Sequence, residues 1–121
     1  MKVAVIGSRD FNDRDRLFAE LDALQKAEGA FLVIVSGGAK GADSLAAEYA
    51  KERDIVLYVI EPDWQRYGRG AGVVRNAEIV RQADVVAAFW DGKSRGTKSS
   101  LDLARKANKP VFVFDCARSG V

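Results

Sequence analysis

Residues 36–43 read SGGAKGAD and lie between an apolar run, FLVIV, at 31–35 and a helix-forming run, SLAAEYA, at 44–50. Three glycines, a lysine and an aspartate thus occupy the point where a strand is expected to pass into a helix. A glycine-rich connection of this kind is typical of the turn between a buried parallel strand and the helix that follows it. The segment therefore favours an α/β fold.

The rest of the chain repeats this alternation of strand and helix. Five short, continuous apolar runs predict buried parallel strands, at 3–6, 31–35, 55–60, 85–89 and 111–114. Four segments between them have stripes of mostly apolar residues at helical spacing: Leu17, Leu21 and Leu24; Leu45, Ala46, Tyr49 and Ala50; Val73, Ala77 and Val80; Leu101, Ala104 and Asn108.

Helix boundaries are marked by residues that favour them. Asn12 or Asp13 is expected to cap the first helix, which Gly29 ends, and Thr97 is expected to open the last, which closes before Pro110. Right-handed crossovers then give a Rossmann-like three-layer α/β/α sandwich. We predict a five-stranded parallel sheet in the order 3-2-1-4-5 with about four helices, forming one domain over residues 1–121. The segment after residue 115 is expected to fray.

Composition removes several classes of function. The chain has no histidine, which excludes histidine-dependent nucleophiles and nearly every zinc site. A single cysteine, Cys116, excludes an internal disulfide, and no apolar run reaches the ~18 residues of a membrane span. We therefore expect a cytoplasmic protein without a signal peptide or membrane partner. The net charge of +2 gives no overall attraction for nucleic acid.

In such a sheet, ligands bind beyond the carboxyl ends of the strands, next to the switch point between strands 1 and 4. Four loops should meet there, at 7–12, 36–43, 61–75 and 90–97. With Lys98 at the edge of the last one, they carry eight basic and five acidic residues. The sequence therefore predicts a binding region with a local excess of positive charge. The first loop contributes Gly7, Ser8 and Arg9 to this region.

The glycines of two loops suggest an anion site. Gly37, Gly38 and Gly41 would let the backbone approach a phosphate, which the free N–H groups of the next helix would bind. Gly96 and Thr97 repeat this arrangement before the last helix. The alternative is that these glycines only form tight turns between strands and helices.

Several side chains have two interpretations each. Ser36 fits a helix cap or a phosphate donor, and Thr97 fits the same two roles. Asp43 fits a partner for the dipole of its own helix, or a ligand for ribose or a metal ion.

The long third loop adds aromatic and basic candidates. Trp64, close to several arginines, would stack on a base or plug the end of the sheet. Arg75 and Asn76 open the third helix, where a bound anion, Asp43 or Asp10 would offset the unfavourable placement of a cation. Trp90 is expected to cap the core, with contact to a ligand as the alternative.

Two familiar phosphate motifs are absent. GKS at 92–94 would belong to a P-loop only if residue 87 were glycine, and it is alanine. The loop after the first strand has a single glycine, so the dinucleotide fingerprint G-x-G-x-x-G is missing as well.

Four motifs together resemble the YspA-like branch of the SLOG superfamily: GSRDF at 7–11, SGGAKGAD at 36–43, EPDWQRYGRGAGVVRN at 61–76 and GKSRGT at 92–97. The superfamily also contains the LOG phosphoribohydrolases and the DNA-processing protein A domain. The resemblance implies a Rossmann-like fold whose glycine turns hold a nucleotide or a nucleotide-derived ligand. Several members of the superfamily act as ligand sensors or effectors in bacterial and phage conflict.

The LOG enzymes carry a P-G-G-x-G-T-x-x-E motif. The segment here has Ser100 in place of the glutamate, while Arg75 matches an arginine of those enzymes. A LOG-like nucleotide N-glycosidase would need another acid, such as Asp43 or Asp10, so Asp43 and Arg75 are the candidate catalytic residues.

Three functions follow from these observations. The preferred one is a binding module for a small nucleotide or nucleotide derivative, without catalysis, followed by the N-glycosidase and, least favoured, a protein that binds single-stranded DNA. No metal or cofactor is required, and Mg²⁺ is neither demanded nor ruled out. A homodimer or higher homo-oligomer is compatible with the sequence.

Overall fold

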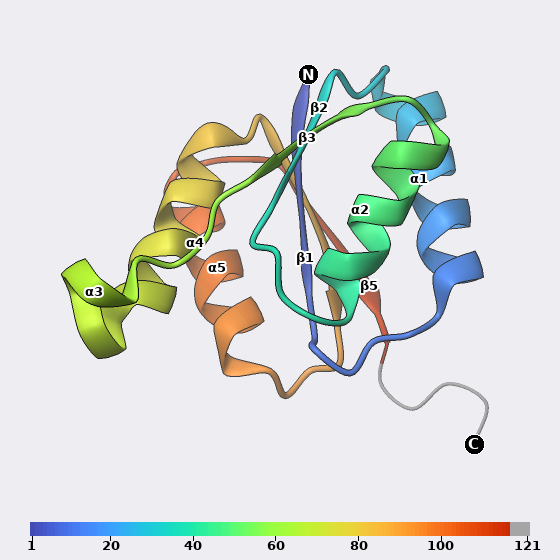
Figure 1. The fold of residues 1–121 in the computed structure, drawn as a ribbon. Helices are drawn as coiled ribbons and strands as arrows, with labels where there is room; N and C mark the ends of the chain where they lie inside the picture. The colour runs from blue at the N-terminus through green and yellow to red at the C-terminus, as the bar shows by residue number, and fades with distance from the viewer. Residues whose placement is uncertain (117–121) are drawn as a thin grey trace.

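The computed structural model describes residues 1–116 and contains five parallel strands in the order β3-β2-β1-β4-β5 (Figure 1). The elements are β1 Lys2–Gly7, α1 Arg14–Glu28, β2 Val33–Ser36, α2 Ala42–Glu52, β3 Val56–Val59, α3 Trp64–Tyr67, the 3₁₀ turn η1 Gly68–Gly70, α4 Ala71–Gln82, β4 Val85–Trp90, α5 Arg95–Lys106 and β5 Val111–Asp115. The predicted strand order and the Rossmann-like sandwich are confirmed. The four long helices were expected, whereas α3 and η1 were not.

The central strand β1 divides the core into two layers. Val3 and Val5 point into a cluster with the apolar faces of α1 and α2. Ala4 and Ile6 point the opposite way, into a second cluster with α4 and α5. This alternation puts α1 and α2 on one face of the sheet and α4 and α5 on the other (Figure 1). Both faces of β1 are therefore covered, which explains its continuous apolar sequence.

The predicted helix ends are confirmed at α1 and corrected at α5. Asp13 accepts a hydrogen bond from the Arg16 amide at 3.1 Å, and Gly29 ends the helix with a positive φ of 116°. Helix α5 begins earlier than expected, and its cap is Ser94, whose hydroxyl accepts from the Thr97 amide at 3.5 Å. Thr97 therefore lies inside the first turn of α5 and does not open it.

Two residues predicted for the apolar stripe of α4 are exposed. Val73 is 60% exposed and Ala77 is also on the surface, whereas Ala71, Ile79 and Val80 are buried. Val80, the third member of the predicted stripe, is buried as expected, whereas Val73 borders an open cavity instead of the sheet. Asn108, likewise expected in the core, lies in an exposed left-handed turn (φ 58°) after α5.

No helix within residues 1–116 has the length and apolar character to cross a membrane. The segment expected to fray begins at Cys116, whose amide instead donates to the Trp90 carbonyl at 2.9 Å. Its other residues, 117–121, lie outside the described part of the chain.

Candidate functional site

A cavity of about 670 Å³ lies at the carboxyl ends of β1 and β4, where the sequence places the site. Ten of the thirteen predicted ligand-binding residues line it: Gly7, Ser8, Arg9, Gly37, Asp43, Trp64, Arg75, Asn76, Gly96 and Thr97. The other three, Ser36, Gly38 and Gly41, do not. The four loops therefore converge as predicted, although not every residue in them faces the cavity.

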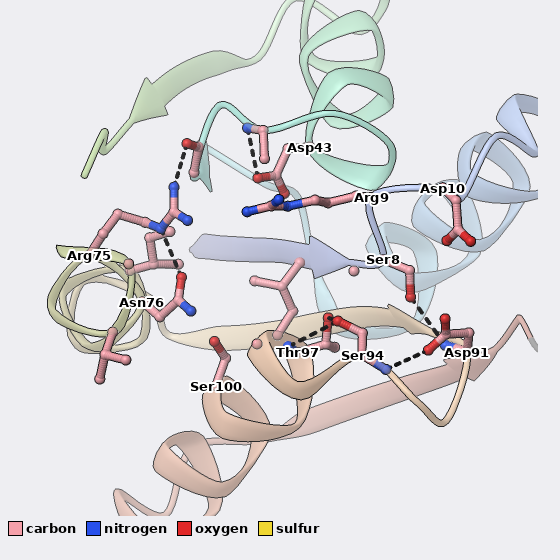
Figure 2. Close-up of a pocket in the computed structure, with 18 of the residues that line it drawn as sticks. Ser8, Arg9, Asp10, Asp43, Arg75, Asn76, Asp91, Ser94, Thr97 and Ser100 are labelled. Carbon is pink, nitrogen blue, oxygen red and sulfur yellow. Dashed lines mark hydrogen bonds between the residues drawn. The ribbon is translucent and has the colours of Figure 1, made fainter. Parts of the chain in front are cut away.

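Asp43 occupies the anion position of its own loop (Figure 2). Its carboxylate accepts a hydrogen bond from the Ala39 amide at 3.1 Å. Burial raises the pKa of Asp43, while the Ala39 bond, the Arg75 charge, the Gly37 bond and the Arg9 charge act to lower it. The protein thus supplies its own carboxylate to an amide of this glycine-rich loop.

Arg75 of α4 forms a hydrogen bond with the loop after β2. Its Nη1 donates to the Gly37 carbonyl at 2.7 Å, and its Nε donates to Oδ1 of Asn76 at 2.8 Å (Figure 2). Asp43 lies close enough for its pKa to respond to the Arg75 charge. Helix α4 begins at Ala71, so Arg75 and Asn76 lie in its second turn and do not open it as predicted.

Close packing explains the glycines of the first glycine-rich loop. A Cβ on Gly41 would lie 2.3 Å from the Ser8 carbonyl oxygen, and one on Gly37 would lie 2.7 Å from Nη1 of Arg75. Gly38 and Gly41 also have positive φ angles of 72° and 75°. Gly41 is the N-cap position of α2, so Ser36 is not the cap, and the buried Ser36 hydroxyl accepts from the Gly38 amide at 3.4 Å.

Glycines in the first turns of α4 and α5 behave differently. Gly72 and Gly96 are each the second residue of a helix, and both line the cavity. Among the atoms of residues 1–116, a Cβ on Gly72 would meet none within 4 Å, and one on Gly96 would reach only the Asn76 side-chain nitrogen at 4.0 Å. No neighbouring protein atom therefore requires glycine at either position.

Buried hydroxyl groups line the side of the cavity formed by β1 and α5. Ser8, Thr97 and Ser100 are buried, and the Ser94 and Thr97 hydroxyls lie 3.1 Å apart. Within residues 1–116, every buried side-chain polar atom has a hydrogen-bond partner. The Ser8, Ser94 and Thr97 hydroxyl groups are therefore held by hydrogen bonds within the protein.

Asp91 fixes the loop that leads into α5. One carboxylate oxygen accepts from the Ser94 and Lys93 amides, each at 2.8 Å (Figure 2). These two bonds lower the pKa of Asp91. The side chain is consequently a charged acceptor at neutral pH and contributes negative charge to the cavity.

The charge of the lining corrects the prediction of a cationic hollow. Three arginines and three aspartates line the cavity: Arg9, Arg69, Arg75, Asp10, Asp43 and Asp91. Other cations of the loops are used elsewhere, since Lys98 pairs with Asp102 at 3.0 Å and Arg66 lies over the Tyr67 ring. The cavity therefore offers both cationic and anionic partners to a ligand.

The two tryptophans have separate roles. Trp64 lines the cavity and is 59% exposed, so it does not plug the sheet. Trp90 packs against the core cluster under α4 and α5 and donates from Nε1 to the Ser94 carbonyl at 3.0 Å, as expected for a residue that caps the core. Only Trp64 of the two is placed to contact a ligand.

Sequence reasoning missed several lining residues, among them Arg69, Gly72, Asp91, Ser94 and Ser100. Asp91 and Ser94 carry a detectable signal, because Asp and Ser before a helix are typical of turns and caps. Gly72 carried none. No group of acidic or cysteine side chains suited to a metal ion occurs within the described residues.

The geometry is that of a Rossmann-like domain with a cavity at the switch point of its sheet. The model of the YspA, cpYpsA-related SLOG family matches residues 1–67, and the chain belongs to that family. The match ends before α4, so the half of the cavity formed by α4 and α5 lies outside it.

A phage protein is similar to this chain over most of its length. The Gene 61 protein of Mycobacterium phage D29 is 39% identical over 120 residues, which cover 93% of this chain and 95% of that protein.

Two solved structures of DNA processing protein A are similar in fold. The one from Helicobacter pylori, in a study of its single-stranded DNA binding mode, gives a TM-score of 0.73 at 27% identity, covering 99% of this chain and 67% of that one. The structure from Streptococcus pneumoniae gives a TM-score of 0.77 at 21% identity, covering 98% of this chain and 52% of that one. This chain thus spans about two thirds and about half of those proteins.

Proposed function

We propose that this protein binds a nucleotide or a nucleotide-derived small molecule in the cavity between the β1 and β2 loops and the first turns of α4 and α5. A volume of about 670 Å³ lies within the usual range for small-molecule sites, roughly 300–1,000 Å³. The lining combines arginines for phosphate, carboxylates for hydroxyl groups and an exposed Trp64 for a base. Nucleotides present all three of these chemical groups together.

The observation that carries this proposal is the open space at Gly72 and Gly96. Glycine near the start of a helix is less favourable than alanine by up to about 1 kcal/mol, and neither position needs glycine for packing. Both positions face the same cavity. A ligand that touches the backbone at these two turns explains why a methyl group is absent from both.

Different sides of the cavity suit different chemical groups of a nucleotide. The first turn of α5, with the Ser94 and Thr97 hydroxyls beside Gly96, suits a phosphate group. Asp43 already fills the turn after β2, so that side suits the hydroxyl groups of a ribose rather than a second anion. The base then extends toward Trp64.

Calorimetric titration tests the proposal directly. We expect at least one member of a panel of nucleoside monophosphates, diphosphates, cyclic nucleotides and ADP-ribose derivatives to bind the wild-type protein. Gly96→Ala should weaken that binding by tenfold or more while leaving thermal stability equal or slightly higher.

The matched control is Gly70→Ala. Gly70 also has open space and an ordinary φ of –80°, but it does not line the cavity. Binding by this variant should equal the wild type. A panel that gives no binding, or a Gly96→Ala variant that binds as well as Gly70→Ala, contradicts the proposal.

Single-stranded DNA is the second candidate, because the H. pylori structure at 27% identity belongs to a protein whose single-stranded DNA binding mode has been described. That likeness weighs against our expectation that nucleic acid is not a partner. Fluorescence anisotropy with a labelled oligonucleotide separates the two candidates. DNA binding should weaken steeply with added salt in proportion to the phosphates contacted, whereas binding of one nucleotide should weaken little.

Hydrolysis is tested by the release of free base from nucleoside monophosphates. Ser100 lines the cavity where the LOG motif has its glutamate, so α5 supplies no carboxylate there. We expect no release. Base release that is abolished by Asp43→Asn and Arg75→Ala would instead establish an N-glycosidase.

A further inference from the structure

Two neighbouring residues of α4 share a hydrogen bond that helical geometry alone does not provide. Nε of Arg75 donates to Oδ1 of Asn76 at 2.8 Å. Adjacent side chains on a helix point in different directions and do not face each other. Here they meet because Nη1 of Arg75 also donates to the Gly37 carbonyl at 2.7 Å, which holds the guanidinium group beside Asn76. Both residues are half-buried and line the cavity.

This bond determines which way the Asn76 side chain faces. The Nε–H group of an arginine can only donate, so it must meet the oxygen of the amide group and not its nitrogen. The NH₂ group therefore lies on the side away from Arg75 (Figure 2). It is close to the first turn of α5, since a Cβ on Gly96 would lie 4.0 Å from Nδ2 of Asn76.

The NH₂ group of Asn76 lacks a protein acceptor and lies near other donors. Within residues 1–116, no hydrogen bond joins its Nδ2 to a protein atom. Every buried side-chain polar atom in that part of the chain has a partner, so this nitrogen is open to the cavity. Gly96 is the second residue of α5, and the first N–H groups of a helix have no acceptor within the helix. Donors on both sides fit a ligand that supplies several oxygen atoms, as a phosphate group does.

We propose that Nδ2 of Asn76 donates a hydrogen bond to a phosphate oxygen of the ligand, and that Arg75 is the positioning residue that turns the amide group toward it. This inference rests on the phosphate position of the proposed function and identifies a side chain that contacts it. The contribution of Arg75 to binding then passes through Asn76. It differs from that of a catalytic arginine, which would touch the reacting atoms.

Asn76→Asp tests the direction of the donor. Aspartate keeps an oxygen for Nε of Arg75, so thermal stability should be equal or higher, but it puts a carboxylate oxygen where the NH₂ group was. Binding of the best nucleotide of the calorimetric panel should weaken by about tenfold or more. The matched control is Gln65→Glu, the same chemical change at an exposed position of α3 that does not line the cavity. Asn76→Asp binding as well as Gln65→Glu would overturn the proposal.

A double-mutant cycle tests the positioning role of Arg75. Arg75→Lys keeps the positive charge near Asp43, but its single nitrogen cannot reproduce the two bonds that Nε and Nη1 make in a fixed geometry. It should weaken nucleotide binding in the wild-type background and have no further effect in an Asn76→Ala background. Equal weakening in both backgrounds would show that Arg75 does not act through Asn76.

An NMR titration with inorganic phosphate gives a readout that does not depend on which nucleotide binds. The side-chain NH₂ resonances of Asn76, identified by their absence from Asn76→Ala, should shift to saturation together with the Gly96 amide. If they do so while no nucleotide of the panel binds, the proposed function fails and this contact stands. If a nucleotide binds and neither it nor phosphate moves the Asn76 NH₂ resonances, the contact fails and the proposed function stands. No response to either probe would contradict both.

Discussion

The two glycine-rich regions of the site use glycine for opposite reasons. In the loop between β2 and α2, a side chain at Gly41 would overlap the backbone at Ser8 and Arg9. At Gly72 and Gly96, in the first turns of α4 and α5, a side chain would enter open space. The first loop is thus packed against the protein, and the two helix turns are open to whatever fills the cavity.

This contrast shows why glycine content alone does not locate a binding site. The sequence singled out the loop at 36–43 because it holds three glycines, yet the Ala39 amide of that loop already donates to the Asp43 carboxylate. The more informative glycines stand singly inside helices. Substitutions at the two kinds of position should therefore change stability and binding in opposite ways.

Gly41→Ala should have the largest effect. The new Cβ would lie 2.3 Å from the Ser8 carbonyl oxygen, and the φ of 75° disfavours alanine. We expect a loss of about 3–5 kcal/mol in the free energy of unfolding, from overlap and backbone strain together. Urea denaturation measures it, and a loss below about 1 kcal/mol would show that the loop can move aside.

Asp43→Asn should destabilise the fold by about 1–2 kcal/mol, because the amide NH₂ group has two donors and places at least one of them where either form of the carboxyl group presents an oxygen atom to the Ala39 amide or to Arg75. The effect should depend on pH. Burial raises the pKa of Asp43 in the folded protein above its ordinary 3.8. The wild-type free energy of unfolding therefore decreases relative to that of the variant as the pH rises from 3.8 through the pKa of the folded protein.

Urea denaturation at several pH values measures this dependence for both proteins. The gap in unfolding free energy between wild type and Asp43→Asn should be largest in acid and narrow as pH rises. A gap that widens with pH would show that hydrogen bonds and the Arg75 charge outweigh burial at this carboxyl group.

Gly96→Ala should change stability by only about 0.5 kcal/mol, and in the stabilising direction, because alanine favours the helix and meets no neighbour. A thermal melt measures the difference. Destabilisation by more than about 1 kcal/mol would mean that the turn is more tightly packed than the structure shows and would remove the contrast with Gly41.

Trp64→Ala should have the smallest effect on stability, near zero, because most of the side chain is exposed. Loss of stacking on a base should nevertheless weaken nucleotide binding by about 1–3 kcal/mol. Calorimetry with Tyr67→Ala as the control tests this, since Tyr67 is exposed on the same short helix but does not line the cavity. Equal binding by both variants would exclude Trp64 from the site.

Most of the fold could be predicted from the sequence because its determinants are local. Continuous apolar runs such as Val85–Trp90 mark strands buried on both faces, and the topology rules for βαβ units then order them. Asp13 and Gly29 were correctly placed at helix ends for the same local reason.

The parts of the site that could not be predicted depend on contacts between distant segments. The Arg75 bond to the Gly37 carbonyl spans 38 residues, and nothing near Gly72 in the sequence shows that it faces open space. The exposure of Val73 was not predicted, because an apolar residue at helical spacing is expected to be buried in the core even where the helix borders a cavity.

The most direct test of the account is an NMR titration of the ¹⁵N-labelled protein with the nucleotide that binds best in the calorimetric panel. We expect the amide resonances of Gly72 and Gly96 to shift in proportion to saturation and to identify the first turns of α4 and α5 as the contact surface. Resonances that move at Gly38 and Gly41 while Gly72 and Gly96 stay still would contradict it.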